Sequence, residues 1–398
     1  RPFWNPEIEA MGREEIARLQ LERLRWQVER CYHGSQFYRQ KFQRAGIAPE
    51  TIRSLQDLAK IPVLTKEEMR QEQEEHPPFG RYVLAPQSSW RELHPSTGTT
   101  GAPVHTIWSQ RDEENITQWT VRTLWTSGVR AGDIVQNAFS YGLWVAGMSV
   151  HYAALAMGCF VLPVSTAATD RQIDYFLGIG STVLISTPSF ALHMAERLRE
   201  RGIAPNALRL RIGIFGGEPG AEVPATRHKI ESGLGIDAYD YYGLAEVGPT
   251  LASECSQKAG LHWCEDHILV EAVDPATGGQ CRPGEVGVLV LTHLTKEATP
   301  MLRYWTNDCA RVDPAPCPCG RTMLRTPGIL GRADDMIIYR GAKFYPAQVE
   351  KVVRSFSEPG NEFRIRLTRE ERSGAERVTV VAECVEEPAA TEQLKELV

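Results

Sequence analysis

The sequence predicts an α/β protein with a large, multi-sheet N-terminal domain over residues 1–330 and the start of a small α+β lobe over residues 331–398. Two patterns indicate this division. Between residues 133 and 217, short apolar runs alternate with helix-length segments, which is typical of parallel sheets covered on both faces. From about residue 267 the pattern changes to strands, and the segment after 331 carries strand, helix and strand signals.

Composition excludes several classes of protein. A chain of 398 residues exceeds one typical core, so at least two domains are expected. The net charge of −6 argues against a nucleic-acid partner, and no apolar run is long enough for a membrane span. The first six residues contain no signal-peptide core. The odd number of cysteines, scattered through a long chain, favours a reducing compartment, so we expect a cytoplasmic protein.

The N-terminal third is expected to be mainly helical. Apolar residues at three- and four-residue spacing predict helix within 7–46, and residues 61–68 predict a strand end followed by an N-capped helix. The remaining elements are expected as strands at 106–108, 133–139, 159–163, 182–186, 210–217, 268–273 and 286–291, and helices at 110–128, 143–158, 169–178 and 188–201. Glycine-rich segments follow several of these strands, and ligands of such folds bind beyond the carboxyl ends of strands.

A glycine-punctuated run of hydroxyl side chains follows the first helices. Glycines allow backbone N–H groups to turn toward an anion, and Ser and Thr add donors without bulk, as a triphosphate requires. The run lacks the Gly-Lys-Ser/Thr ending of a Walker loop, and a solvated linker is the alternative interpretation. Its residues are Ser96, Thr97, Gly98, Thr99, Thr100 and Gly101, followed by Ala102 and Pro103.

Four further stretches follow this loop in order, at 215–219, 241–246, 303–308 and 331–341. In this order the five stretches resemble the adenylate-forming (AMP-binding) superfamily, and most closely its phenylacetate–CoA ligase family. The resemblance covers essentially the whole chain. Additional stretches that resemble this subgroup lie at 253–255, 265–267, 294–298 and 345–350.

The resemblance implies roles for individual residues in binding ATP and Mg²⁺. The hydroxyl loop, with Thr99 and Thr100, would hold the β- and γ-phosphates, and Glu246 would bind Mg²⁺ through its carboxylate. Asp308 would accept hydrogen bonds from the ribose, Arg332 would lie near ribose and phosphates, and Asp334 or Asp335 would be the hinge of a mobile small lobe. The adenine site would comprise Gly217, Glu218, Pro219, Tyr241, Tyr242 and Gly243, with Tyr242 stacking near the base.

Each of these residues also has a simpler interpretation. Asp308 alone reads as a turn residue, Glu246 as an exposed carboxylate, and Arg332 with its neighbouring aspartates as a solvated turn. An aryl substrate is expected near Tyr141, Gly142, Phe215, Gly216 and Ala245, although Tyr141 at a strand exit is equally consistent with core packing.

The implied chemistry needs no catalytic triad. A substrate carboxylate is already ionised at neutral pH, so its attack on the α-phosphate requires alignment and neutralisation of negative charge rather than a general base. Thiol attack on the acyl-adenylate needs different surroundings, and therefore a rotation of the small lobe.

Two departures from the family pattern stand out. The loop usually carries a lysine before its proline, where this chain has Ala102, so a cation near the γ-phosphate is missing. The lysine that serves adenylation in the superfamily would lie beyond Val398. Lys395 has no matching context, and the small lobe is expected to be incomplete.

A metal site is also expected. Three thiolates and an imidazole form a closed tetrahedral set suited to structural Zn²⁺. Such a site would join the loop after Glu246 to the segment after Asp308. Its candidate ligands are Cys255, His262, Cys317 and Cys319, with Cys264, His267 and Cys309 as rivals and reduced, unliganded cysteines as the alternative.

The leading hypothesis is an AMP-forming ligase that activates an aryl or arylacetic acid and passes it to coenzyme A. One alternative transfers the acyl group to a carrier-protein thiol or an amine. A second, of another class, is a non-catalytic nucleotide-binding regulatory protein, for which Ala102 is the hint. The resemblance also makes a homodimer reasonable.

Overall fold

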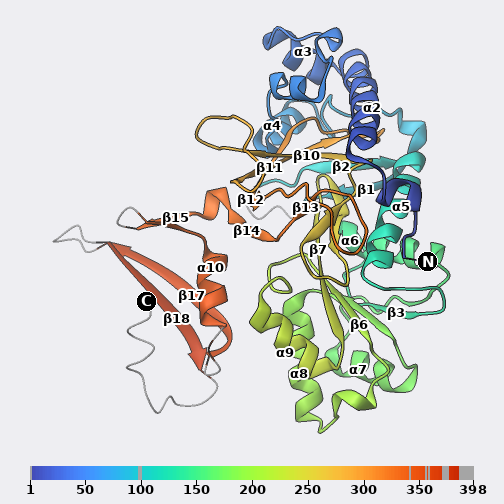
Figure 1. Ribbon diagram of the computed structural model, residues 1–398, viewed down its shortest axis with the longest axis vertical. Helices are drawn as coiled ribbons and strands as arrows, with labels where there is room; N and C mark the ends of the chain where they lie inside the picture. The colour runs from blue at the N-terminus through green and yellow to red at the C-terminus, as the bar shows by residue number, and fades with distance from the viewer. Residues whose placement is uncertain are drawn as a thin grey trace.

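The computed structural model describes residues 2–96, 101–339, 342–354, 356, 359–369 and 376–384. Figure 1 shows a large body with its N-terminal helices at one end and α7–α9 at the other, and a small C-terminal lobe at its side. The division at residue 330 stays a prediction. Among these described residues, no helix is long and apolar enough to cross a membrane.

An eight-stranded mixed sheet forms the centre of the large body, in the order β13-β9-β8-β7-β6-β5-β3-β4. The run from β4 to β7 is parallel, and the run from β7 to β13 is antiparallel. The strands are β3 (Ile134–Asn137), β4 (Phe160–Leu162), β5 (Val183–Ser186), β6 (Ile212–Phe215), β7 (Asp237–Leu244), β8 (Gly248–Glu254), β9 (Leu261–Trp263) and β13 (Arg325–Thr326).

Helices cover both faces of the parallel half, as the alternating pattern predicts. Successive residues of a strand point to opposite faces. Accordingly Val183 and Ile185 pack with α5 and α6, while Leu184 packs with α7, α8 and α9. These helices are α5 (Gln110–Thr126), α6 (Val145–Ala156), α7 (Thr169–Gly178), α8 (Pro188–Glu200) and α9 (Pro224–Leu234). The expected elements between 106 and 217 are confirmed, whereas α9 and the antiparallel strands β7–β9 were not predicted.

A second, four-stranded antiparallel sheet has the order β10-β11-β12-β14. Its strands are β10 (Ile268–Val273), β11 (Val286–His293), β12 (Tyr304–Arg311) and β14 (Ile329–Arg332). The expected strands at 268–273 and 286–291 are confirmed. The pairing of β12 with β14 sets Asp308 opposite Arg332, so it joins two motifs that are separate in the sequence.

The N-terminal helical stretch is divided. Its helices are α1 (Pro6–Glu9), α2 (Arg13–Gly34) and α3 (Gln36–Arg44), with a break at Ser35, whose hydroxyl caps α3 by accepting from the Tyr38 N–H. The expected capped helix is α4 (Lys66–Glu75): Thr65 and Glu68 form a reciprocal capping box. Short 3₁₀ turns occupy η1 (Pro49–Thr51), η2 (Leu55–Lys60), η3 (Gln87–Ser89), η4 (Pro205–Ala207) and η5 (Ala333–Asp335).

A hairpin of β1 (Trp90–Pro95) and β2 (His105–Ser109) flanks the hydroxyl-rich loop. The small lobe contains β15 (Ile337–Tyr339), β16 (Ala342–Phe344), α10 (Pro346–Val353), β17 (Pro359–Arg369) and β18 (Glu376–Cys384). Its strand, helix and strand order agrees with the expectation. Lys395 lies outside the described residues.

Candidate active site between the two lobes

A cavity of about 620 Å³ lies where the carboxyl ends of the parallel strands face the beginning of the small lobe. Its walls come from residues 65–67, 144–146, 241, 243–246, 304–307, 332, 334 and 335, together with Gly217 and Pro249; Asp308 is not among them. Of the expected site residues, the lining contains Gly217, Tyr241, Gly243, Ala245, Glu246 and Arg332, with Asp334 and Asp335. The position agrees with the rule that ligands of such sheets bind beyond the strand ends.

The carboxylate of Glu246 reaches this cavity from the turn between β7 and β8, and it is only 7% exposed. Lys66, the first residue of α4, places its Nζ 2.8 Å from Glu246 Oε1. This ion pair could not be predicted from the sequence, because α4 and β7 are far apart in the chain. The N-cap at Thr65 was the only local signal for where Lys66 begins its helix.

Asp308 lies directly behind the cavity wall and is 7% exposed. It accepts a hydrogen bond from the Tyr242 hydroxyl at 2.6 Å, and Arg332 Nη1 lies 3.7 Å from its other oxygen. Burial raises the pKa of Asp308 to about 6, although Tyr242 and Arg332 act in the opposite direction. The carboxylate is therefore held by two partners in surroundings that disfavour its charge.

Tyr242, the expected stacking residue, does not line this cavity, and its role at the adenine stays a prediction. Its ring is buried against Trp263, with the centroids 5.5 Å apart, and its hydroxyl is used on Asp308. Tyr241 lines the cavity in its place. Because side chains alternate along a strand, only one of the two adjacent tyrosines can face the cavity. Tyr242 is thus a support for Asp308.

The aromatic residues that line the cavity are Trp144, Tyr241, Tyr304 and Trp305, and Phe139 lies behind the wall between the first two. The Phe139 centroid lies 4.7 Å from Trp144 and 6.1 Å from Tyr241, both in edge-on contacts. Gly217 adopts a φ of +87°, and a Cβ there would lie 3.2 Å from the Trp144 ring. A glycine is therefore required under this tryptophan.

Four residues of the expected aryl pocket, Tyr141, Gly142, Phe215 and Gly216, are not among those that line this cavity, and their role stays a prediction. Phe215 is fully buried in the core on the other side of the sheet, and a Cβ on Gly216 would lie 2.6 Å from Tyr241. Tyr141 accepts from Asn137 Nδ2 at 2.9 Å and lies 3.1 Å from His151 Nδ1, so it belongs to a polar cluster. Gly142 is exposed, as are Glu218 and Pro219 of the expected adenine site, and Glu218 accepts from the Ser189 N–H.

The hydroxyl-rich loop closes on itself at its base. Ser96 is 4% exposed, and its hydroxyl accepts a hydrogen bond from the Val104 N–H at 2.9 Å. From α4, Arg70 Nε donates to the Ala102 carbonyl at 2.8 Å. The expected phosphate-binding residues Thr97, Gly98, Thr99 and Thr100 lie outside the described residues.

Comparison with known proteins agrees with this site. The sequence model of the family described as AMP-binding enzyme matches residues 21–305. The chain belongs to this family. The phenylacetate–coenzyme A ligase of Thermus thermophilus is 40% identical over 370 residues, which cover 92% of this chain and 82% of the relative. This AMP-binding enzyme therefore groups with the phenylacetate–CoA ligases and is an AMP-forming acid–thiol ligase.

Solved structures give the same fold. A 2-hydroxyisobutyryl-CoA ligase in its postadenylation state has a TM-score of 0.90 and 31% identity, over 96% of this chain and 81% of that one. The same ligase in its thioesterification state has a TM-score of 0.82 and 32% identity, over 96% of this chain and 82% of that one. The arrangement of the AMP-binding enzyme described here is thus more similar to the first state.

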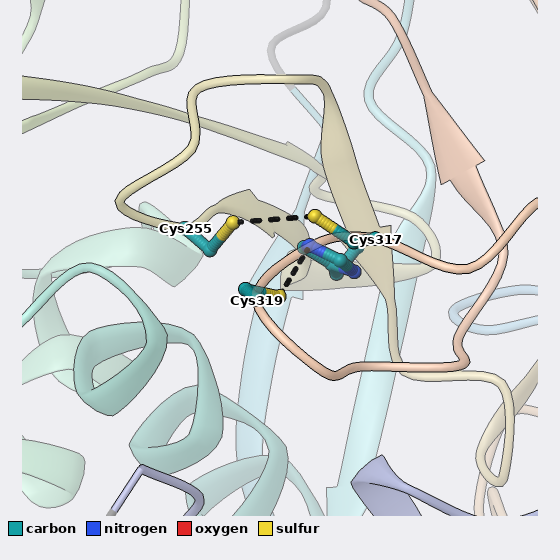
Figure 2. Close-up of side chains that lie close together, drawn as sticks. Cys255, Cys317 and Cys319 are labelled. Carbon is teal, nitrogen blue, oxygen red and sulfur yellow. Dashed lines mark hydrogen bonds between the residues drawn. The ribbon is translucent and has the colours of Figure 1, made fainter.

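A second cluster of functional side chains lies at the β8–β9 turn and the loop before β13 (Figure 2). Ligand atoms of Cys255, His262, Cys317 and Cys319 all lie within 4.8 Å of one another. Cys255 Sγ and Cys317 Sγ are 3.8 Å apart, and Cys319 Sγ is 3.6 Å from His262 Nε2. The rival residues Cys264, His267 and Cys309 are not part of this group.

These spacings match the edges of a zinc tetrahedron. With Zn–S of about 2.3 Å and Zn–N of about 2.0 Å, tetrahedral angles separate two sulfurs by about 3.8 Å, and sulfur from nitrogen by about 3.5 Å. Arg321 lies beside the cluster, with Nη1 3.7 Å from Cys319 Sγ and Nη2 2.7 Å from the buried Glu9 carboxylate. The cluster thus ties the N-terminal segment to the two loops.

Proposed function

We propose that this enzyme uses ATP and Mg²⁺ to activate an aryl or arylacetic acid as its adenylate, and then transfers the acyl group to coenzyme A. The observation that carries the proposal is the convergence of Glu246, Arg332 and the aromatic wall on one cavity, with Asp308 beside Arg332. The similarity to phenylacetate–CoA ligases over most of the chain supports the acid class and the thiol.

The nucleotide roles follow from the donors and acceptors around the cavity. Glu246 offers the carboxylate oxygens that Mg²⁺ prefers, and a bound Mg²⁺ supplies charge neutralisation to the phosphates. Asp308, ionised above about pH 6, is an acceptor suited to ribose hydroxyls. Arg332 lies between Asp308 and the cavity and is assigned to the ribose and phosphates. We keep Ser96, Gly101 and the four residues between them as the phosphate loop.

The aromatic wall supports an aromatic acid. Trp144 and Tyr241 present ring surfaces that bury an aryl group favourably, and aromatic pairs in edge-on geometry add to that gain. Charged side chains also line the cavity, at Lys66, Glu246 and Arg332. The cavity therefore offers ring surfaces for the acid and charged groups for the nucleotide.

We place the hinge of the small lobe at Asp334 and Asp335. Asp334 accepts from Arg332 at 2.8 Å and from Asn307 at 3.3 Å, so this junction is attached to the large body by exposed polar contacts. Such contacts exchange readily with water, which suits a segment that must turn between half-reactions. Both aspartates also face the cavity.

We assign a structural Zn²⁺ to the cluster of Cys255, His262, Cys317 and Cys319. Three thiolates and one imidazole leave no coordination position for water, so the metal would stabilise the fold rather than take part in the reaction. We also propose a cytoplasmic location and a homodimer, and we keep transfer to a carrier protein as the alternative. Light scattering of the purified protein would test whether it is a dimer.

The experiment uses the full-length gene product with ATP, Mg²⁺ and a panel of aromatic acids, with and without coenzyme A. AMP and acyl-CoA are followed by mass spectrometry. We expect one aromatic acid to give both products. AMP with no thioester would redirect the proposal to a carrier protein or an amine. ATP binding with no turnover for any acid would contradict it and favour the non-catalytic alternative.

A further inference from the structure

Helix α4 carries two cations, one at the cavity and one at the Ala102 end of the hydroxyl-rich loop. Lys66 and Arg70 lie four residues apart and therefore on the same face of the helix. Lys66 lines the cavity and contacts Glu246, while Arg70 Nε donates to the Ala102 carbonyl at 2.8 Å. A Cβ on Gly101 would lie 3.4 Å from the Arg70 guanidinium carbon, so Arg70 packs closely on the end of the loop.

The loop itself carries no cation. From Ser96 to Pro103 there is neither Lys nor Arg, and Ala102 stands where the family resemblance implies a lysine. Adenylation forms a bond between the substrate carboxylate oxygen and the α-phosphorus, while the bond to the bridging oxygen breaks and pyrophosphate leaves with the electron pair. Negative charge therefore builds up on the leaving pyrophosphate and requires a nearby cation.

Among the described residues, the cationic side chains that line the cavity are Lys66 and Arg332. Arg332 is engaged by Asp334 and lies 3.7 Å from Asp308, on the ribose side. Lys66 is held by one oxygen of Glu246, whose second oxygen stays available for Mg²⁺. This leaves Lys66 as the cation beside the expected metal position.

We infer that α4 supplies the charge that the loop lacks: Lys66 binds the pyrophosphate end of ATP, and Arg70 positions the loop through the Ala102 carbonyl. The inference rests on the proposed ATP-dependent function. It also explains how Ala102 is compatible with catalysis. Lys66 is assigned as a binding and catalytic residue, whereas Arg70 acts through the loop and is a positioning residue.

The helix start does not depend on the Lys66 side chain. The capping box uses Thr65 and Glu68, so Lys66→Met should leave α4 intact. A matched control is Lys41→Met, because Lys41 Nζ contacts Glu68 of the same helix at 2.6 Å, outside the residues that line the cavity. Any effect caused by loosening of α4 should appear in both variants.

The test compares Lys66→Met, Arg70→Met, Ala102→Lys and the double variant Lys66→Met/Ala102→Lys in acid-dependent ATP–pyrophosphate exchange. Loss of a charged contact predicts a roughly 10- to 100-fold fall in kcat/KM for ATP in Lys66→Met. The double variant should recover most of the lost kcat/KM, because its loop supplies a lysine at position 102. Arg70→Met should raise KM for ATP more than it lowers kcat. Lys41→Met should stay within about twofold.

Direct binding separates this inference from the proposed function. Calorimetry with Mg-pyrophosphate needs no acid substrate, and Lys66→Met should weaken binding roughly 10-fold or more. Unchanged affinity in folded Lys66→Met would overturn the inference even if the wild type is an active ligase. Failure of Ala102→Lys to restore the double variant would also overturn it. Weakened pyrophosphate binding without turnover for any acid would support it while contradicting the ligase function.

Discussion

The charged side chain of Asp308 is expected to lower the stability of the folded protein. Its carboxylate is buried behind the cavity wall, and burial raises its pKa from 3.8 to about 6. Replacement by asparagine keeps the shape and removes the charge. We therefore expect Asp308→Asn to unfold at a higher denaturant concentration than the wild type at neutral pH, and to bind ATP more weakly because the ribose acceptor is altered.

The magnitude follows from the pKa difference. About two pKa units at about 1.4 kcal/mol each correspond to about 3 kcal/mol at pH 7 and above. The sign is set by proton binding: the folded protein holds this proton more tightly than the unfolded chain. The unfavourable contribution of Asp308 therefore grows as the pH rises from about 4 to 6 and is complete above that range.

Urea unfolding followed by tryptophan fluorescence at about pH 5 and pH 7.5 measures this effect. The free energy of unfolding of Asp308→Asn should exceed that of the wild type by about 3 kcal/mol at pH 7.5 and by about half as much at pH 5. Asp266→Asn is the matched control. Burial disfavours that charge too, but His267 and the bidentate Arg122 hold the pKa of Asp266 below its usual value. The same substitution should there reduce stability at pH 7.5.

Two results would refute this reasoning. One is an Asp308→Asn protein that is less stable than the wild type at pH 7.5. The other is a stability difference that does not change with pH, since the effect must follow the ionisation of a single carboxyl group. Opposite signs for the two asparagine variants would show that the partners of each aspartate, rather than burial alone, set its contribution.

Three other predictions concern the metal sites and the acid pocket. Glu246→Gln should raise the Mg²⁺ concentration for half-maximal activity by roughly 10-fold or more, measured by magnesium titration at saturating ATP; an unchanged requirement would contradict its assignment. Cys255→Ser should lower the zinc content from about one per chain and reduce the unfolding temperature, measured by metal analysis and calorimetry, and equal zinc in both proteins would count against the site. Trp144→Ala should raise KM for a small aromatic acid roughly 10-fold and favour bulkier acids, in the acyl-CoA assay; an unaltered preference would remove Trp144 from the pocket.

The parallel half of the fold could be predicted because its signals are local. Buried strands such as Val183–Ser186 are short apolar runs, and α7 was expected at its observed bounds, 169–178. The antiparallel strands β7 and β8 have no such signal. All seven residues of β8 are buried although they include Gly, Pro, Thr, Ser and Glu, because Glu254 is paired with Arg227 and Thr250 with Thr120. Their burial depends on partners distant in sequence.

The site was predictable as a set of motifs but not as a set of contacts. The order of the motifs indicated nucleotide chemistry, and Glu246, Gly217 and Arg332 do converge on one cavity. Which of two neighbouring strand residues faces the cavity depends on the alternation of side chains along the strand. By this alternation Tyr241 lines the cavity, whereas Tyr242 points away from it and contacts Asp308. Lys66 was missed for a different reason: its partner Glu246 is brought near only by the packing of α4 on the large body.

The pairing of β12 with β14 connects the proposed ribose site to the proposed hinge. Asp308 lies opposite Arg332, and Arg332 is followed within two residues by Asp334. If the small lobe turns at Asp334, the Arg332–Asp334 contact must change while the strand that holds Arg332 stays paired with β12. The arginine would then exchange one aspartate partner for the other as the lobe moves. In this arrangement the charge beside the ribose depends on the position of the lobe, so nucleotide affinity and lobe rotation are coupled through one side chain.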